Sequence, residues 1–238
     1  MPVDILLTVI ATAAIQSIFG VGVLLFGTPI LLLLGYDFLS ALTVLLPISI
    51  AINSLQIIKH YQYIDSSFYK NVLIYSIPLV ILLLFFVSTI SLNITFLIGT
   101  FIILVALKNF FPVLEQMLEK MIKYEKPYLA VMGLIHGLTN LGGSLLTAIV
   151  HGKQYDKNAT RVTIAICYAT FAIFQLITLF FIGTESEFST SENMSFLQIG
   201  VIVFLLTEEI IYSDLENKKY SQFFAAFLLI SGILLIIK

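Results

Sequence analysis

Polar residues gather around glycines in two of the most apolar stretches of this chain. Gln16 precedes Gly20 and Gly22 in the first stretch. The second stretch has a longer group of the same character, formed by His136, Thr139, Asn140, Gly142, Gly143 and Ser144. Three amide side chains follow these groups along the sequence: Asn53, Gln56 and Gln175. A polar group in apolar surroundings needs a hydrogen-bond partner or a function, so these residues are the candidate binding site.

Glycines inside an apolar helix can end it and let a new helix begin, and that geometry has a chemical use. The first N–H groups of a helix lack intrahelical partners and attract anions, aided by the helix dipole. Here those groups would belong to about residues 22–25 and 142–145. Two such N-termini would form an anion site without a buried Lys or Arg. The preceding helices end at the same glycines, and their unpaired carbonyl groups suit cations, so an anion is favoured but a cation stays open.

Each candidate also has a purely structural interpretation. The polar side chains could serve only as hydrogen bonds between helices, and the glycines only as close packing contacts. His136 could carry a coupled proton or be a neutral packing residue. For Glu208 and Glu209, a solvated end of a span is favoured over proton coupling.

The elements that hold these residues must lie in a membrane. The chain is 59% hydrophobic and 11% charged, with a mean hydropathy of +1.05, whereas soluble domains carry about 25% charged residues. The apolar stretches are continuous rather than alternating, which predicts helices and not an outer-membrane barrel. The single Cys167 excludes an internal disulfide and a Cys-based metal site. We find no enzymatic motif, and we expect no catalytic residue, metal, cofactor or nucleic-acid partner.

Basic residues indicate how the chain crosses the bilayer, because loop Lys and Arg favour the cytoplasmic side. Apart from Lys238 they form four clusters: Lys59 and Lys70; Lys108, Lys120, Lys123 and Lys126; Lys153, Lys157 and Arg161; Lys218 and Lys219. The predicted full spans are 38–58, 72–90, 94–111, 160–183, 195–212 and 220–237, with a turn at 91–93. Segment 127–152 then begins and ends inside, which predicts a re-entrant hairpin that turns near residues 140–143. The alternative, eight plain spans, places more of the basic residues outside.

The sequence also indicates an internal repeat. Residues 15–22 resemble residues 135–142, and Tyr36 with Asp37 recurs as Tyr155 with Asp156. We therefore predict an all-α polytopic membrane protein with eight hydrophobic segments in two inverted repeats, 1–111 and 127–238. Each repeat would contain a Gly-broken segment, re-entrant or kinked, and three transmembrane helices. An amphipathic helix at 112–126 would link the repeats on the inner surface. Inverted repeats with broken helices are typical of transporters that bind substrate near the bilayer midplane.

The glycine motifs resemble those of a known family. Phe19-Gly20-Val21-Gly22 is followed by Pro29, a leucine run, Gly35 and Ser40-Ala41-Leu42-Thr43. The second half carries Gly133-Leu134-Ile135-His136-Gly137-Leu138 and then Gly142-Gly143. Over nearly its whole length, the chain resembles the sulfite exporter TauE/SafE family of bacterial membrane permeases. That family usually has a longer glycine run at both tips and a proline after each. Here the first run is two glycines, and Ile149-Val150 stands where the second proline would fall.

The resemblance implies a secondary transporter of small anions, such as sulfite or organosulfonates, in the bacterial cell (inner) membrane. Transport would follow alternating access at a midplane site. The partners would be the small anionic substrate and the lipid bilayer, and a homodimer is compatible with the sequence. The resemblance assigns binding only to the two glycine tips and their neighbours. An anion channel and a non-transporting membrane scaffold are the alternatives.

Overall fold

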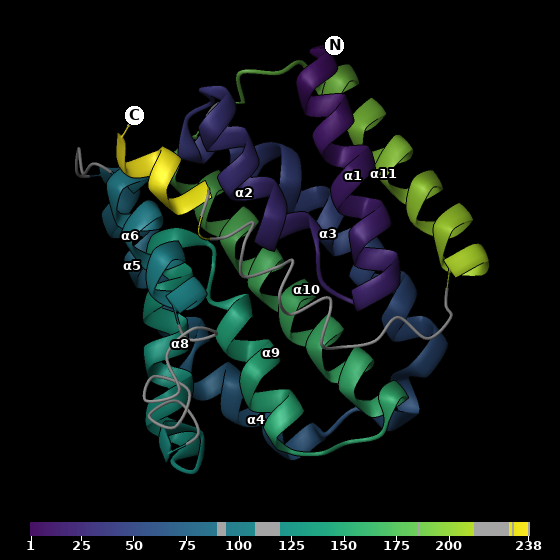
Figure 1. Ribbon diagram of the computed structural model, residues 1–238, viewed down its shortest axis with the longest axis vertical. Helices are drawn as coiled ribbons and strands as arrows, with labels where there is room; N and C mark the ends of the chain where they lie inside the picture. Colours follow the sequence, from purple (N-terminus) through teal and green to yellow (C-terminus); the bar gives the residue numbers. More distant parts are fainter. Residues whose placement is uncertain (90–93, 108–119, 185, 212–228, 230, 238) are drawn as a thin grey trace.

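The computed structural model describes residues 1–89, 94–107, 120–184, 186–211, 229 and 231–237. Within them every regular element is helical, as the apolar sequence predicts (Figure 1). The predicted turn at 91–93, and most of the predicted linker helix and last span, lie outside these residues. The elements are α1 (Val3–Phe19), α2 (Val23–Leu34), α3 (Phe38–His60), the 3₁₀ turn η1 (Tyr61–Tyr63), α4 (Ser66–Tyr75), α5 (Ile77–Thr89), α6 (Ile94–Leu107), α8 (Glu125–Thr139), α9 (Gly143–Gly152), α10 (Lys157–Ile182) and α11 (Thr190–Ile211).

Four stretches of the described chain are long and apolar enough to cross a membrane. They are Phe38–Tyr63, Ser66–Thr89, Lys157–Ile182 and Thr190–Glu208. Phe180 and Phe181 at the end of α10 leave 80% and 81% of their surface exposed. Large apolar side chains facing outward fit a lipid environment, and the molecule is a multi-pass helical membrane protein.

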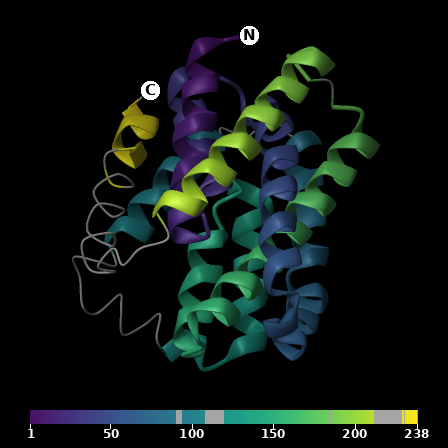
Figure 2. The ribbon, with the colours of Figure 1, turned by 90° about the vertical axis from the view of Figure 1, so that its right-hand side faces the viewer.

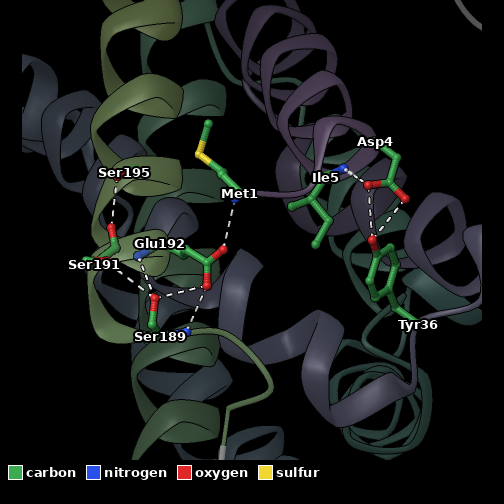
Figure 3. Close-up of polar contacts among 8 residues, drawn as sticks. All are labelled: Met1, Asp4, Ile5, Tyr36, Ser189, Ser191, Glu192 and Ser195. Carbon is green, nitrogen blue, oxygen red and sulfur yellow. Dashed lines mark hydrogen bonds and ion pairs between the residues drawn. The ribbon is translucent and has the colours of Figure 1, made fainter.

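Two spans begin earlier than the apolar sequence predicts, because polar residues cap their first turns. The Asp65 carboxylate accepts a hydrogen bond from the Phe68 N–H at 2.9 Å, so the span expected from residue 72 starts with α4. At α11, the Ser189 N–H donates to Glu192 Oε2 at 3.1 Å, and the Glu192 N–H donates to Ser189 Oγ at 3.3 Å (Figure 3). This reciprocal capping box starts the helix at Thr190 rather than at residue 195.

The centre of the molecule is formed by α3 and α10, which pack against each other (Figure 1). Each begins with an aspartate that caps its first turn. Asp37 accepts from the N–H groups of Leu39 and Ser40, and Asp156 accepts from the N–H of Ala159. The polar ends of these helices are thus fixed, and their apolar middles form the wall on which the glycine-broken segments rest.

Each glycine-broken segment is a helical hairpin. In Figure 1, α1 descends from the N-terminus to the middle of the molecule and α2 returns upward, whereas α8 rises from the bottom and α9 returns downward. The predicted break in segment 127–152 is therefore present, between Thr139 and Gly143. Figure 2 shows α11 crossing α1, which it contacts, and α8 packs on α5 in the same manner. The two turns, here called the first tip (residues 20–22) and the second tip (residues 140–142), both point toward the centre.

Candidate functional site

The first tip depends on two glycines, one for its backbone conformation and one for a close approach. Gly20 takes a left-handed conformation with φ +76°, and its N–H donates to the Gln16 carbonyl at 2.8 Å, ending α1. At Gly22, a Cβ atom would lie 2.5 Å from the Thr12 carbonyl oxygen and 2.6 Å from the Gln16 nitrogen. The return arm therefore begins in direct contact with the backbone of the entering arm.

The second tip repeats this geometry 120 residues later. Asn140, at the position matching Gly20, is also left-handed with φ +61°, which asparagine tolerates better than most residues. A Cβ atom on Gly142 would lie 2.5 Å from His136 Cβ and 2.7 Å from the Met132 carbonyl oxygen. The residues contacted by Gly22 and by Gly142 thus occupy matching positions in the two halves.

A hydrogen-bond network joins the predicted site residues at the first tip. The Val23 N–H donates to Gln16 Oε1 at 2.9 Å, and Gln16 Nε2 donates to Asn53 Oδ1 at 3.1 Å. With the Gln56 amide nitrogen turned toward Asn53, it donates to the same Oδ1 at 3.2 Å. Asn53 in turn donates to the Ser49 carbonyl at 2.7 Å. Gln16, Asn53 and Gln56 are therefore brought together, and one N–H group expected to be free for a ligand is capped by Gln16.

The predicted absence of buried Lys or Arg near the tips is wrong. Arg161, one turn into α10, leaves only 7% of its side chain exposed, and its Cγ lies 3.4 Å from where a Cβ on Gly20 would be. Its Nη2 donates to the Ser17 carbonyl oxygen at 3.2 Å. In the orientation of Gln56 described above, the Gln56 amide oxygen accepts from Arg161 Nε and Nη2, each at 3.2 Å. The guanidinium reaches the tip because the closing turn of α1 offers it a carbonyl.

Glu208 is not the solvated span end that its position in the sequence favours. Its side chain is 12% exposed, and its Oε1 lies 2.9 Å from Arg161 Nη2. Lys59 Nζ approaches the same oxygen at 3.7 Å. The physical reason is the packing of α11 against α1 and α3, which carries the carboxylate to the buried guanidinium. The side chain of Glu209 lies outside the described part of the chain.

The second tip is neutral and less completely bonded. His136 and Gln175 pair through Nε2 and Oε1 at 3.2 Å, and the imidazole stacks against Phe171 with centroids 4.5 Å apart. Three buried polar atoms of this group have no hydrogen-bond partner in the described structure: His136 Nδ1, Asn140 Oδ1 and Gln175 Nε2. All three residues are at least 99% buried. A buried polar atom without a partner destabilises the folded protein unless a ligand or water hydrogen-bonds it. The second tip therefore has the stronger features of a binding site.

The remaining predicted residues have local or connecting roles. Asn140 Nδ2 donates to Thr28 Oγ1 at 2.9 Å, which ties the second tip to the return arm of the first hairpin. The hydroxyl groups of Thr139 and Ser144 donate to backbone carbonyls within their own turn. At Gly143, a Cβ would overlap the Tyr168 hydroxyl, so the start of α9 lies directly against α10.

The open ends of both hairpins are closed by polar contacts. Tyr36 Oη donates to both carboxylate oxygens of Asp4, at 3.0 and 2.9 Å (Figure 3), and burial together with this contact raises the pKa of Tyr36. At the other hairpin, Lys153 Nζ lies 2.6 Å from Glu125 Oε2. These contacts hold the two arms of each hairpin together at the ends far from the tips.

A second polar cluster holds the start of α4 against the segment before α10. Burial opposes ionisation of Asp65, but the hydrogen bond from Tyr155, those from the Phe68 and Ser67 N–H groups and the charge of Lys153 outweigh it. Together they hold the pKa of Asp65 below its ordinary value. The cluster lies outside the apolar spans and gives one measurable pH dependence.

Sequence reasoning missed four residues that complete the two tips: Thr28, Lys59, Arg161 and Glu208. One signal for Arg161 was available, because it falls inside the predicted span 160–183 and not in a loop. Among the residues that the structure describes, no group of three or more His, Cys, Asp or Glu side chains is placed to hold a metal ion. The chemistry that the tips offer is therefore hydrogen bonding from backbone N–H, amide and guanidinium groups.

Comparison with protein-family models identifies the family of this chain. The model of the family described as Sulfite exporter TauE/SafE matches residues 5–235, almost the entire chain. No curated protein and no solved structure matched the chain at the significance required.

Proposed function

We propose that this chain, which belongs to the sulfite exporter TauE/SafE family, moves sulfite or a small organosulfonate by alternating access at a site between the two hairpin tips. Membership of that family implies a membrane transporter of sulfur anions, which fits a role without catalysis. The proposal concerns the substrate, the site and the mechanism. The chain would act in the bacterial cell membrane.

An inverted repeat is the architectural part of the proposal. α1 and α8 end at Phe19 and Thr139, and α2 and α9 begin at Val23 and Gly143, each pair 120 residues apart. α3 and α10 begin at Phe38 and Lys157, 119 residues apart. Each hairpin also packs against a helix of the other half, because α1 packs on α11 and α8 packs on α5. These matches support two inverted halves, 1–111 and 127–238, related through the centre of the molecule.

The contact between Asn140 and Thr28 is the observation that carries the site. It places the second tip beside the return arm of the first hairpin, so that the N-termini of α2 and α9 serve one region. An oxyanion there would accept hydrogen bonds from Gln175 Nε2, which has no partner in the described structure, and from the Gly143 N–H at the start of α9, because the next two N–H groups already donate to the Leu141 and Gly142 carbonyls. Helix N-termini favour negative ligands, which fits a sulfur oxyanion.

A conformational change would then follow from the hairpins themselves. The second tip is bonded to the return arm of the first hairpin, and each hairpin is closed at its far end by its own polar contact. A hairpin can therefore rock as a unit and expose the shared region to one side of the membrane at a time. This is the alternating-access behaviour of transporters with broken helices.

Flux of radiolabelled sulfite through purified, reconstituted protein tests the proposal. We expect wild-type protein to carry sulfite and Asn140→Leu to lose at least about tenfold in initial rate, because the tips lose their contact. Asn193→Leu makes the same change on α11, where the Asn193 amide bonds Ser186 far from the tips, and should keep its activity. Wild-type protein that moves no sulfite, or equal rates for the two variants, would refute the proposed function.

A further inference from the structure

Three charged side chains meet beside the first tip, and the proposed site does not use them. Arg161 is more than nine-tenths buried, Glu208 is largely buried and Lys59 is 59% exposed. Both cations approach the same carboxylate oxygen, at 2.9 Å from Arg161 and 3.7 Å from Lys59. One carboxylate oxygen of Glu208 therefore lies between the two cations.

The guanidinium also contacts two neutral groups. They are the Ser17 carbonyl oxygen and the amide oxygen of Gln56. A buried Arg is stable only with a well-placed negative partner, and its planar fork matches the oxygens of a carboxylate or of another oxyanion. Glu208 thus occupies a position that an oxyanion ligand could take.

We propose that Arg161, Lys59 and Glu208 form a second anion site, in which a sulfite-type oxyanion displaces the Glu208 carboxylate from Arg161. Lys59, the exposed member, receives the anion first, and Arg161 then exchanges its carboxylate partner for it. The displaced carboxylate keeps Lys59 as its counter-ion. The nature of the anion rests on the proposed function, whereas the exchange rests on the geometry of the three side chains.

The site is connected to the first tip through side-chain amides. Arg161 bonds Gln56, Gln56 bonds Asn53, and Asn53 bonds Gln16, which caps the N-terminus of α2. A change of partner at Arg161 can therefore shift the start of the return arm. On this basis the second site is a loading position for the anion that also prepares the first tip to receive it.

Binding of radiolabelled sulfite to the purified full-length chain, measured by equilibrium dialysis, tests the exchange. Glu208→Gln removes the competing charge and should tighten sulfite binding by about tenfold, while slowing transport because the anion leaves Arg161 more slowly. The double variant Arg161→Gln with Glu208→Gln keeps the charge balance and should lose this gain. Glu192→Gln, a carboxylate change at the other end of α11, is the matched control and should leave binding unchanged.

A surface variant keeps the test decisive if Glu208→Gln does not fold. Lys59→Gln alters an exposed side chain and should weaken sulfite binding about threefold, whereas Lys70→Gln on the exposed side of α4 should not. If Glu208→Gln folds, unchanged sulfite binding by that variant would overturn the exchange. If it does not fold, unchanged sulfite binding by Lys59→Gln would overturn it.

The same measurements separate the exchange from the proposed function. In one outcome, the protein transports sulfite normally and substitution of Lys59, Arg161 or Glu208 does not change sulfite binding. That outcome would support the proposed function and refute the second site. In a second outcome, Glu208→Gln binds sulfite, this binding is lost without Arg161, and the wild-type protein does not transport sulfite. That outcome would support the second site and refute the proposed function. Absence of binding to both wild type and Glu208→Gln would overturn both.

Discussion

The two hairpin tips have the same backbone and different side-chain surroundings. Gln16 and His136 occupy matching positions, but Gln16 caps the start of its return arm, whereas the His136 ring hydrogen-bonds Gln175 on α10. The first tip lies beside a buried Arg161 and its carboxylate partner. Within the part of the chain that the structure describes, the second tip retains three buried polar atoms without hydrogen-bond partners.

This difference shows which features a repeated fold must keep and which it can change. The left-handed turn and the glycine that contacts the entering arm occur in both halves, because a Cβ at either glycine would overlap atoms of that arm. The side chains that fill the space around each tip are not under that constraint. The first tip is bonded internally and lies beside a charged pair, and the second keeps the buried polar atoms to which the proposed function assigns the ligand.

The largest effect is expected where the tips are alike. Gly22→Ala and Gly142→Ala each force a Cβ into backbone atoms less than 3 Å away, so each should lower the free energy of unfolding by about 3 kcal/mol or more and abolish transport. Gly152→Ala, whose Cβ would meet only the Ile122 side chain at 3.3 Å, is the control. Thermal unfolding in detergent measures the effect. If only one of the two tips tolerated alanine, the two tips would not have equivalent backbone packing.

A smaller effect is expected where the tips differ. Gln16→Leu leaves the Val23 N–H without its partner and removes a bond to Asn53, which should cost about 2–4 kcal/mol. His136→Leu removes one bond to Gln175 and should cost about 1–2 kcal/mol. Unfolding of the two variants under identical conditions gives the comparison, and equal losses would show that the first tip is not the better bonded one.

The smallest effect concerns the polar cluster outside the spans. The pKa of Asp65 is lowered in the folded state, so its contacts stabilise the protein above the unfolded pKa of about 3.9 and stop doing so as pH falls through the folded value. Tyr155→Phe should therefore cost about 1 kcal/mol or less at neutral pH, because the contact is only partly buried and solvent weakens it. The difference from wild type should shrink in acid, and a difference that grows on acidification would contradict this assignment.

The helix breaks could be predicted from sequence because they follow from glycine itself. Gly20, Gly22 and Gly142 interrupt apolar runs at matching places, and only a turn or a close approach explains them. The amides Gln16, Asn53 and Gln56 could likewise be assigned to one region, since polar groups in apolar surroundings seek one another. Residues 91–93 and most of residues 112–126 lie outside the described structure, so the turn and the linker helix stay predictions.

The charged pair could not be predicted, because its members lie far apart in sequence. Arg161 and Glu208 each stand near the end of an apolar stretch, where a charge is normally solvated, and only the packing of α11 against α1 brings them together. The use of Gln16 as a cap was also beyond the sequence, since an amide one turn before a glycine break suits a ligand equally well. The starts of α4 and α11 were missed because capping residues extend both helices into polar sequence.

The central claim is that the two hairpins enter the membrane from opposite faces, and cysteine labelling tests it most directly. Cys167 is replaced by Ser, and single cysteines are placed at Lys126, Lys157 and Glu187. With an impermeant thiol reagent outside intact cells, we expect labelling at position 187 and protection at 126 and 157, since both ends of the second hairpin lie inside. Ready labelling at 157 with protection at 126 would mean that residues 127–152 cross the membrane, which would contradict the account.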